Sequence, residues 1–165
     1  MSPETPTQDV SELIAQAAAS APAEEGSSPP AARNAVPGCD VLIIDDMGAS
    51  RELLSAILRN FAGRLELREA RNGTEGLELW TRLGPRVTLL DIDMPDISGL
   101  TLLQKMRAAR PDSFVAMISG GGSLDNVKTA LAHGASGFVI KPYKPQRILD
   151  LLAKYEKQSG HNLMS

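Results

Sequence analysis

Four runs of aliphatic residues in this chain each stop at a polar residue. They are VLII at 41–44, VTLL at 87–90, FVAMI at 114–118 and GFVI at 137–140. Continuous short aliphatic runs are typical of strands that are buried on both faces of a parallel sheet. A fifth segment, LELREA at 65–70, alternates apolar and polar residues, which indicates a strand at the edge of that sheet.

Each predicted strand is followed by a segment whose apolar residues recur at helical spacing. These residues are Leu53, Leu54, Ile57, Leu58 and Phe61, then Leu77, Trp80 and Leu83, then Leu100, Leu103 and Met106, then Leu124, Val127 and Leu131, and finally Ile148, Leu149, Leu152 and Tyr155. Thr74 and Ser98 are the predicted N-caps of the second and third helices. Gly63 and Gly134 mark helix ends, and Pro145 suits the first turn of the last helix.

Alternation of strands and helices predicts an α/β fold with a doubly wound, five-stranded parallel sheet. Right-handed crossovers place helices on both faces of such a sheet, and the first strand should lie near its centre. The 165 residues and 42% hydrophobic content suffice for one domain with a core.

The first 38 residues differ in composition from the rest of the chain. They contain six of the eleven prolines, many Ala and Ser, and no aromatic residue. This composition predicts a disordered, acidic leader at 1–38. Apolar residues at helical spacing in 10–18 indicate a transient helix there, with a helix that docks on a partner as the alternative. The ordered domain is expected at 39–157, with a tail at 158–165 and no second output domain.

The charge of the chain and its cysteine content indicate which partners and which cellular compartment to expect. Outside the leader there are 16 basic and 15 acidic residues, so no basic surface favours nucleic acid as a partner. No apolar run reaches the length of about 18 residues needed to cross a membrane, and the first residues do not combine a basic region with an apolar one as a signal peptide would. Cys39 is the only cysteine, which agrees with a reducing compartment. A cytoplasmic protein without membrane contact is expected.

The polar residues that follow the strands are the candidates for a functional site. They are Asp45 and Asp46, Asp91, Ser119 and Lys141. The carboxyl ends of parallel strands meet at one edge of a sheet, where open α/β folds hold their ligand sites. Because crowded carboxylates repel one another unless a cation neutralises them, this arrangement predicts a metal with oxygen ligands, such as Mg²⁺.

Asp91 is the candidate nucleophile. A carboxylate oxygen can accept a phosphoryl group when a metal and a cation neutralise the charge of the attacked phosphate. Mg²⁺ held by Asp46 and Asp91 would supply one positive charge and the Lys141 ammonium another. The Ser119 hydroxyl can donate a hydrogen bond to a phosphoryl oxygen.

The succession of IIDD, LLDIDMP followed by Gly99, MIS and FVIKP resembles the receiver domain of two-component response regulators, over residues 39 to 157. The resemblance implies the flavodoxin-like strand order 2-1-3-4-5. It also implies a single-domain response regulator of a phosphorelay, similar to the chemotaxis regulators. Such a protein accepts phosphate from a sensor histidine kinase or phosphotransfer protein and signals to an unknown protein target. It would not be an enzyme with turnover on an external substrate.

The resemblance also implies a role for each site residue. Asp91 would be phosphorylated, and Asp46 and Asp91 would ligate Mg²⁺ directly. The backbone carbonyl of Asp93 would be a further ligand, while Asp45 would act through a bound water molecule. Lys141 would pair with the phosphoryl group.

Signalling in relatives depends on a switch pair, which corresponds here to Ser119 and Phe138. The Ser119 hydroxyl would move toward the phosphate and the Phe138 ring would turn inward. The surface of the fourth helix, fifth strand and fifth helix would then change its preferred partner. The Lys141–Pro142 peptide is expected to be cis.

Simpler interpretations exist for each residue taken alone. Asp45 and Asp46 could cap the next helix, Ser119 could be a turn residue, Lys141 a surface lysine, and Phe138 plain core. Two other functions stay open. DID at 91–93 also resembles the nucleophile motif of haloacid-dehalogenase-like, Mg²⁺-dependent phosphatases, although their acidic pair follows the lysine. A scaffold that binds a partner without phosphorylation is the third possibility.

Overall fold

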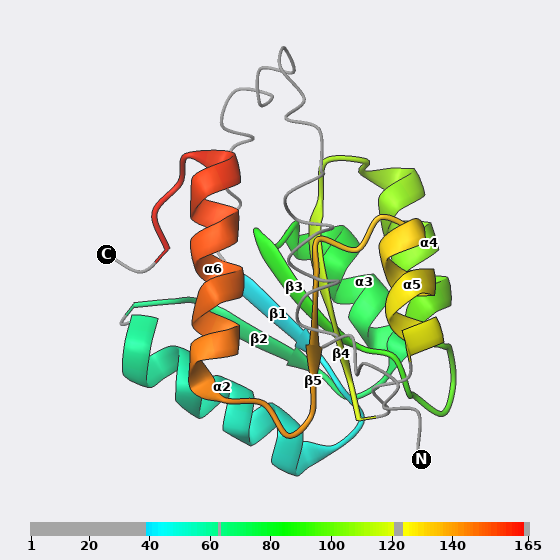
Figure 1. Cartoon of the computed structure of the whole chain (residues 1–165), viewed down its shortest axis with the longest axis horizontal. Coiled ribbons are helices and arrows are strands. Elements are labelled where there is room, and N and C mark those ends of the chain that lie inside the picture. Colours follow the sequence, from blue (N-terminus) through cyan, green and yellow to red (C-terminus); the bar gives the residue numbers. More distant parts are fainter. Residues whose placement is uncertain (1–38, 63, 121–123, 164–165) are drawn as a thin grey trace, which may run out of the picture.

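The computed structural model of the chain describes residues 39–62, 64–120 and 124–163, in which strands and helices alternate (Figure 1). The strands are β1 (Val41–Ile44), β2 (Leu67–Ala70), β3 (Val87–Asp91), β4 (Phe114–Ser119) and β5 (Gly137–Ile140). The helices are α2 (Gly48–Ala62), α3 (Gly73–Leu83), α4 (Gly99–Ala109), α5 (Leu124–Ala132) and α6 (Pro145–Ser159). The leader predicted at 1–38 lies outside the described residues.

The five strands form one parallel sheet in the order β2-β1-β3-β4-β5. This confirms the predicted doubly wound α/β fold, the strand order and the interior place of β1. Strand β2, whose sequence alternates, lies at an edge, whereas every residue of β1, β3 and β4 is buried. The continuous aliphatic runs are therefore the strands that are covered on both faces.

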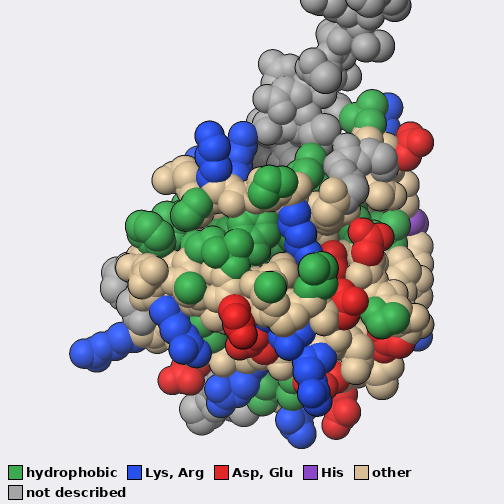
Figure 2. Space-filling model, turned by 90° about the horizontal axis from the view of Figure 1, so that it is seen from below, with side chains coloured by type: hydrophobic (Ala, Val, Ile, Leu, Met, Phe, Trp, Pro, Cys, Tyr) green, Lys and Arg blue, Asp and Glu red, His purple; other side chains and the backbone are tan. Residues whose placement is uncertain are grey.

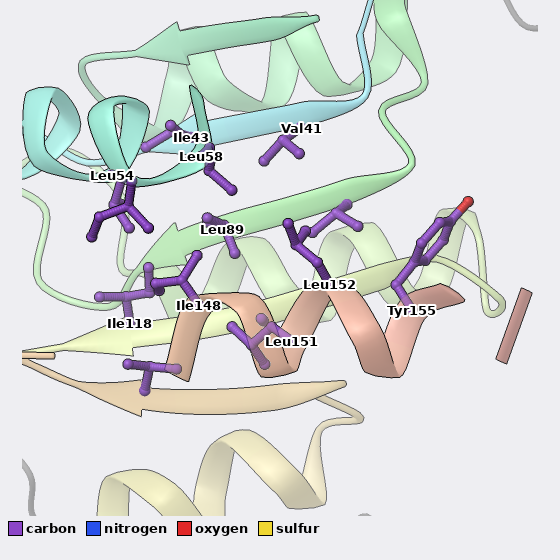
Figure 3. Packing of buried hydrophobic residues seen from close by; sticks show 14 of the residues in the cluster. Val41, Ile43, Leu54, Leu58, Leu89, Ile118, Ile148, Leu151, Leu152 and Tyr155 are labelled. Atoms are coloured by element: carbon purple, nitrogen blue, oxygen red, sulfur yellow. The ribbon is translucent and has the colours of Figure 1, made fainter. Parts of the chain in front are cut away.

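Side chains alternate across the sheet and divide the core into two clusters. Val41 and Ile43 face one cluster, which α2 and α6 cover, and Leu42 and Ile44 face the other, which α3, α4 and α5 cover (Figure 1). Figure 3 shows the first cluster, in which Leu151 and Leu152 of α6 pack against the sheet.

The helix ends follow from local chemistry. The Leu100 N–H donates to the Ser98 hydroxyl at 3.2 Å, which confirms the predicted cap of α4. Pro145 begins α6, as predicted. The cap of α3 is Asn72 rather than Thr74, because the Asn72 side-chain oxygen accepts from the Glu75 N–H at 2.8 Å. Gly84 ends α3 in the left-handed conformation, with φ of 56°.

Two details depart from the predicted packing. The helical spacing predicts Leu53 and Phe61 on the buried face of α2, but their exposed fractions are 51% and 56%. Of the five apolar residues predicted on that face, Leu54, Ile57 and Leu58 are the buried ones. At the other end of the chain, Leu163 is buried in the α2 and α6 cluster, although it lies in the segment predicted as a tail. The domain boundary at 157 stays a prediction.

Among the described residues, no helix combines the length and the apolar character needed to cross a membrane. The face seen from below in Figure 2 carries acidic and basic side chains next to each other, beside a larger gathering of hydrophobic side chains. This mixed surface differs from the continuous basic stripe that nucleic acid favours.

Candidate metal and phosphoacceptor site

Strand register brings the predicted polar residues together at one edge of the sheet. Ile44 of β1 pairs with Leu90 of β3, so Asp45 and Asp91, the next residues, follow neighbouring strands at the same level. On the other side of β3, Ser119 ends β4 beside Ile140, and the Lys141 N–H donates to the Ser119 carbonyl at 2.8 Å.

Three carboxylates meet at this edge. Asp45, Asp46 and Asp91 each offer an oxygen, and these oxygens lie within 4.8 Å of one another. Asp45 and Asp91 are buried, with 1% and 3% exposed, while Asp46 is exposed to solvent. The cluster therefore has one open side from which an ion can enter.

The Lys141 ammonium lies between the two buried carboxylates. Its Nζ donates to Asp45 Oδ2 at 2.9 Å and lies 3.8 Å from Asp91 Oδ1. Burial by itself would lower the pKa of Lys141, but the hydrogen bond to Asp45 and the charge of Asp91 hold it above its usual value. Lys141 is therefore a permanent cation at this site.

The two buried carboxyls have opposite pKa shifts. Burial would raise the pKa of Asp45, but the Ser50 hydroxyl, the Met47 N–H and Lys141 together lower it. Burial and the charge of Asp45 raise the pKa of Asp91 to about 7, against the opposing charge of Lys141. Asp45 thus holds the negative charge, and Asp91 is the carboxyl that is costly to ionise without a further cation.

The remaining predicted residues lie close by. Ser119 is fully buried at the end of β4, and Phe138 is buried inside β5 with 2% exposed. The Asp93 N–H donates to Asp91 Oδ1 at 3.4 Å, but the Asp93 carboxylate is outside the group of three. The Lys141–Pro142 peptide is cis, as predicted.

Asp96 is a residue of this region whose contacts no sequence pattern predicted. Its carboxylate accepts from the N–H groups of Gly73 and Thr74 at 2.9 Å each and from the Thr74 hydroxyl at 2.8 Å. These bonds join the loop after Asp91 to the first turn of α3, whose N–H groups have no partner within the helix. The bonds to Gly73 and Thr74 hold the pKa of Asp96 well below its usual range.

Replacing Asp96 with Ala should lower the melting temperature at neutral pH more than replacing Glu78, an exposed acid within α3, with Ala. A depressed folded-state pKa contributes stability above the unfolded-state value of about 4, and that contribution fades as pH falls below it. Thermal unfolding from pH 3 to 8 would measure the difference. Equal losses for both variants at neutral pH would show that the Asp96 bonds do not support the fold.

Comparison with known proteins shows the family of this chain. The response regulator receiver domain matches residues 41–153. The chain therefore belongs to the response regulator receiver domain family. Its sequence is 32% identical over 120 residues to a chemotaxis protein CheY of Thermotoga maritima, covering 73% of this chain and 99% of that protein.

Solved structures agree with this membership. A CheY-like receiver domain protein of Methanospirillum hungatei is 31% identical, with a TM-score of 0.68 and coverage of 76% of this chain and 99% of that one. The CheX–CheY–BeF3–Mg complex of Borrelia burgdorferi is 27% identical, with a TM-score of 0.64, covering 68% of this chain and 85% of that chain. The chain is thus a receiver of two-component signalling with the flavodoxin-like fold.

Receiver domains bind Mg²⁺, and the residues present fit that ion. Three carboxylate oxygens within 4.8 Å of one another form a hard, anionic donor set, open on the side of Asp46. Two of these carboxylates are buried beside a single ammonium, so an added cation would relieve their repulsion.

Proposed function

We propose that this chain accepts a phosphoryl group on Asp91 from a phosphohistidine of a sensor kinase or phosphotransfer protein, and then binds a protein target differently. The observation that carries the proposal is the raised pKa of Asp91, about 7, in a cluster of acids beside Lys141. A buried carboxyl with this environment marks a functional site.

The proposed reaction uses the chain's own groups as follows. A carboxylate oxygen of Asp91 attacks phosphorus, the bond from phosphorus to the donor nitrogen breaks, and that nitrogen keeps the electron pair. Lys141 neutralises the oxygens of the transferred group, starting from its position 3.8 Å from Asp91. Magnesium, when bound, supplies further positive charge at the phosphoryl oxygens.

The proposed metal ligands are Asp46, Asp91 and the backbone carbonyl of Asp93, with Asp45 acting through a bound water molecule. Asp46 suits direct ligation because it is the exposed member of the cluster. Asp45 suits a supporting role because Met47 N–H and Lys141 already occupy its two oxygens, at 2.9 Å each.

The proposed output surface consists of α5, β5 and α6, which are the predicted fourth helix, fifth strand and fifth helix. Ser119 and Phe138 are the proposed switch pair. Ser119 ends β4 next to β5, and Phe138 pairs with Met117 in that same contact between strands. A shift of Ser119 toward the phosphoryl group can therefore act on the strand that carries Phe138. The cytoplasm is the proposed compartment.

The two other functions make different experimental predictions. A phosphatase of the haloacid dehalogenase type would turn over a phosphate ester many times, whereas a scaffold would bind its partner with Asp91 unmodified. The order of the acids opposes the phosphatase, because Asp45 and Asp46 precede the nucleophile in the chain. The complete set of acids with Lys141 opposes the scaffold.

Incubation of the full chain with acetyl phosphate and Mg²⁺, followed by intact mass measurement, tests the proposal. We expect the mass of one phosphoryl group per chain, and no adduct when EDTA replaces Mg²⁺. Repeated release of phosphate from a simple ester would favour the phosphatase. A chain that gains no mass with acetyl phosphate or with a phosphorylated kinase domain would favour the scaffold.

A further inference from the structure

The side chain of Arg51 folds back from the start of α2 onto the turn that carries two acids of the cluster. Its Nη1 donates to the backbone carbonyl of Asp45 at 2.7 Å. The exposed fraction of the Arg51 side chain is 15%, so this contact is largely shielded from solvent. Because a charged donor makes shorter and stronger hydrogen bonds than a neutral one, the bond is a firm restraint on that carbonyl.

A second residue holds the Arg51 guanidinium from the edge of the sheet. Glu69 of β2 lies beside Ile43 of β1 in the parallel ladder, and its Oε1 is 3.3 Å from Arg51 Nε. The guanidinium is planar and its donors form a rigid fork, so a partner on Nε also sets where Nη1 points. Glu69 also balances the positive charge of Arg51, which would otherwise oppose a cation at the nearby acids.

Helix chemistry does not explain a basic residue at this place. Arg51 is the fourth residue of α2, close to the helix end where the dipole favours acids, and the first turn of α2 contains no acid. An ion pair with a partly exposed glutamate contributes little to stability by itself. The contact with the Asp45 carbonyl is therefore the feature that gives Arg51 a specific role.

Arg51 completes a set of bonds around Asp46. The Asp45 N–H donates to the Ala70 carbonyl at 3.1 Å, and Asp45 Oδ1 accepts from the Met47 N–H at 2.9 Å. With the bond from Arg51 to the Asp45 carbonyl, the backbone on both sides of Asp46 is held. Asp46 itself is exposed to solvent, so the direction of its carboxylate depends on this turn rather than on packing.

That direction matters because the three carboxylates repel one another. An oxygen of Asp46 lies within 4.8 Å of oxygens of Asp45 and Asp91. Without a cation, an Asp46 on a loose turn would move its charge into solvent, away from the two buried acids. Binding of Mg²⁺ would then have to order Asp46 again, which lowers the affinity for the ion.

We propose that Arg51, oriented by Glu69, is a positioning residue that holds Asp46 ready for the metal. Arg51 acts through the Asp45 carbonyl and not by contact with the ion or the phosphoryl group. The inference rests on the proposed function, in which Asp46 and Asp91 ligate Mg²⁺. It adds that the affinity for the metal depends on a pair of residues from α2 and β2 outside the acidic cluster.

The test removes each partner in the full chain. Arg51→Met removes the guanidinium and keeps an apolar side chain, and Glu69→Ala removes the group that orients it. Arg71→Met is the matched control, because Arg71 also pairs with a glutamate, Glu75 at 3.8 Å, but its side chain is 75% exposed. Nuclear magnetic resonance measures binding of Mg²⁺ alone. Intact mass measurement gives the rate of adduct formation with acetyl phosphate over a range of Mg²⁺ concentrations.

We expect Arg51→Met to bind Mg²⁺ about tenfold more weakly than wild type, a loss typical for removal of a group that orients metal ligands. Glu69→Ala should also bind it more weakly, and the double variant should match Arg51→Met, because Glu69 acts through Arg51. Arg71→Met should bind like wild type. Adduct formation in Arg51→Met should need about tenfold more Mg²⁺ for its half-maximal rate but reach the wild-type maximum, because the reacting groups are unchanged.

Two results would overturn the inference and leave the proposed function intact. One is wild-type affinity for Mg²⁺ in Arg51→Met or, if that variant does not fold, in Glu69→Ala. The other is a lower maximal rate of adduct formation with an unchanged requirement for Mg²⁺, which would assign Arg51 to the fold in general. Wild type that binds Mg²⁺ but gains no phosphoryl group would instead defeat the proposed function, while the binding comparison would still decide the role of Arg51.

Discussion

Replacing Asp91 with Asn is expected to abolish the phosphoryl adduct and, in the metal-free protein, to raise the stability of the fold at neutral pH. The amide oxygen is too weak a nucleophile to attack phosphorus, so the adduct formed with acetyl phosphate should disappear. Intact mass measurement checks this result. An adduct of undiminished amount would place the phosphoacceptor on another residue.

The gain in stability follows from the pKa of Asp91. The folded-state value of about 7 lies above the unfolded value of about 4, so the folded protein holds its proton more tightly. This contribution is fully present below pH 4 and is lost as pH rises through about 7, where the charge of Asp91, buried beside that of Asp45, destabilises the fold. A pKa raised from about 4 to about 7 corresponds to a free energy of about 4 kcal/mol, which solvent near the site reduces to about 1–2 kcal/mol.

Urea unfolding in EDTA between pH 4 and 8 measures this effect. Asp91→Asn should match wild type near pH 4 and exceed it increasingly up to about pH 7. Asp45→Asn is the contrasting variant, because the lowered pKa of Asp45 contributes stability above pH 4. It should therefore be less stable than wild type at neutral pH. If both substitutions changed the stability at neutral pH in the same direction, the assignment of the negative charge to Asp45 rather than Asp91 would be contradicted.

Replacing Gly99 with Ala is expected to destabilise the protein by about 2–3 kcal/mol or more and to disrupt the site. A Cβ at this position would lie 2.1 Å from the Asp91 carbonyl oxygen and 2.7 Å from the Ile92 Cα, both of which are backbone atoms. The Gly99 N–H also donates to the Ile92 carbonyl at 2.9 Å. The start of α4 must move away from β3, and the loop that follows Asp91 must move with it.

The same substitution also has a stabilising effect, which is smaller than the loss from the steric contacts. Ala in place of Gly stabilises a compatible position by about 0.4–1 kcal/mol through the unfolded state, which cannot offset contacts of this length with backbone. Gly120→Ala is the matched control, because its Cβ would meet nothing within 4 Å. Thermal unfolding and adduct formation measure both variants. A Gly99→Ala protein as stable as Gly120→Ala would show that the approach of α4 to β3 is not required.

The sequence alone was sufficient for the fold class and for most of the site. Continuous apolar runs are typical of strands whose two faces are covered by helices, and they identified β1, β3 and β4 inside the sheet as well as β5 at its edge. The carboxyl ends of parallel strands lie at the same edge of the sheet. Asp45, Asp91, Ser119 and Lys141 each end or follow a strand, so they were expected together at that edge. Local signals also identified the Ser98 cap and Pro145 at the start of α6. The apolar spacing of α2 was less reliable, because it cannot tell which of Leu53, Leu54 and Phe61 faces the sheet.

Tertiary structure decided the electrostatics and the contacts between distant segments. The opposite pKa shifts of Asp45 and Asp91 depend on burial and on the reach of Lys141, which no local pattern contains. The bonds from Asp96 to α3 and the hydrogen bond from Lys141 to Asp45 join residues far apart in the chain. Periodicity reports which face of an element is apolar, whereas a charge responds to every group that folding brings near it.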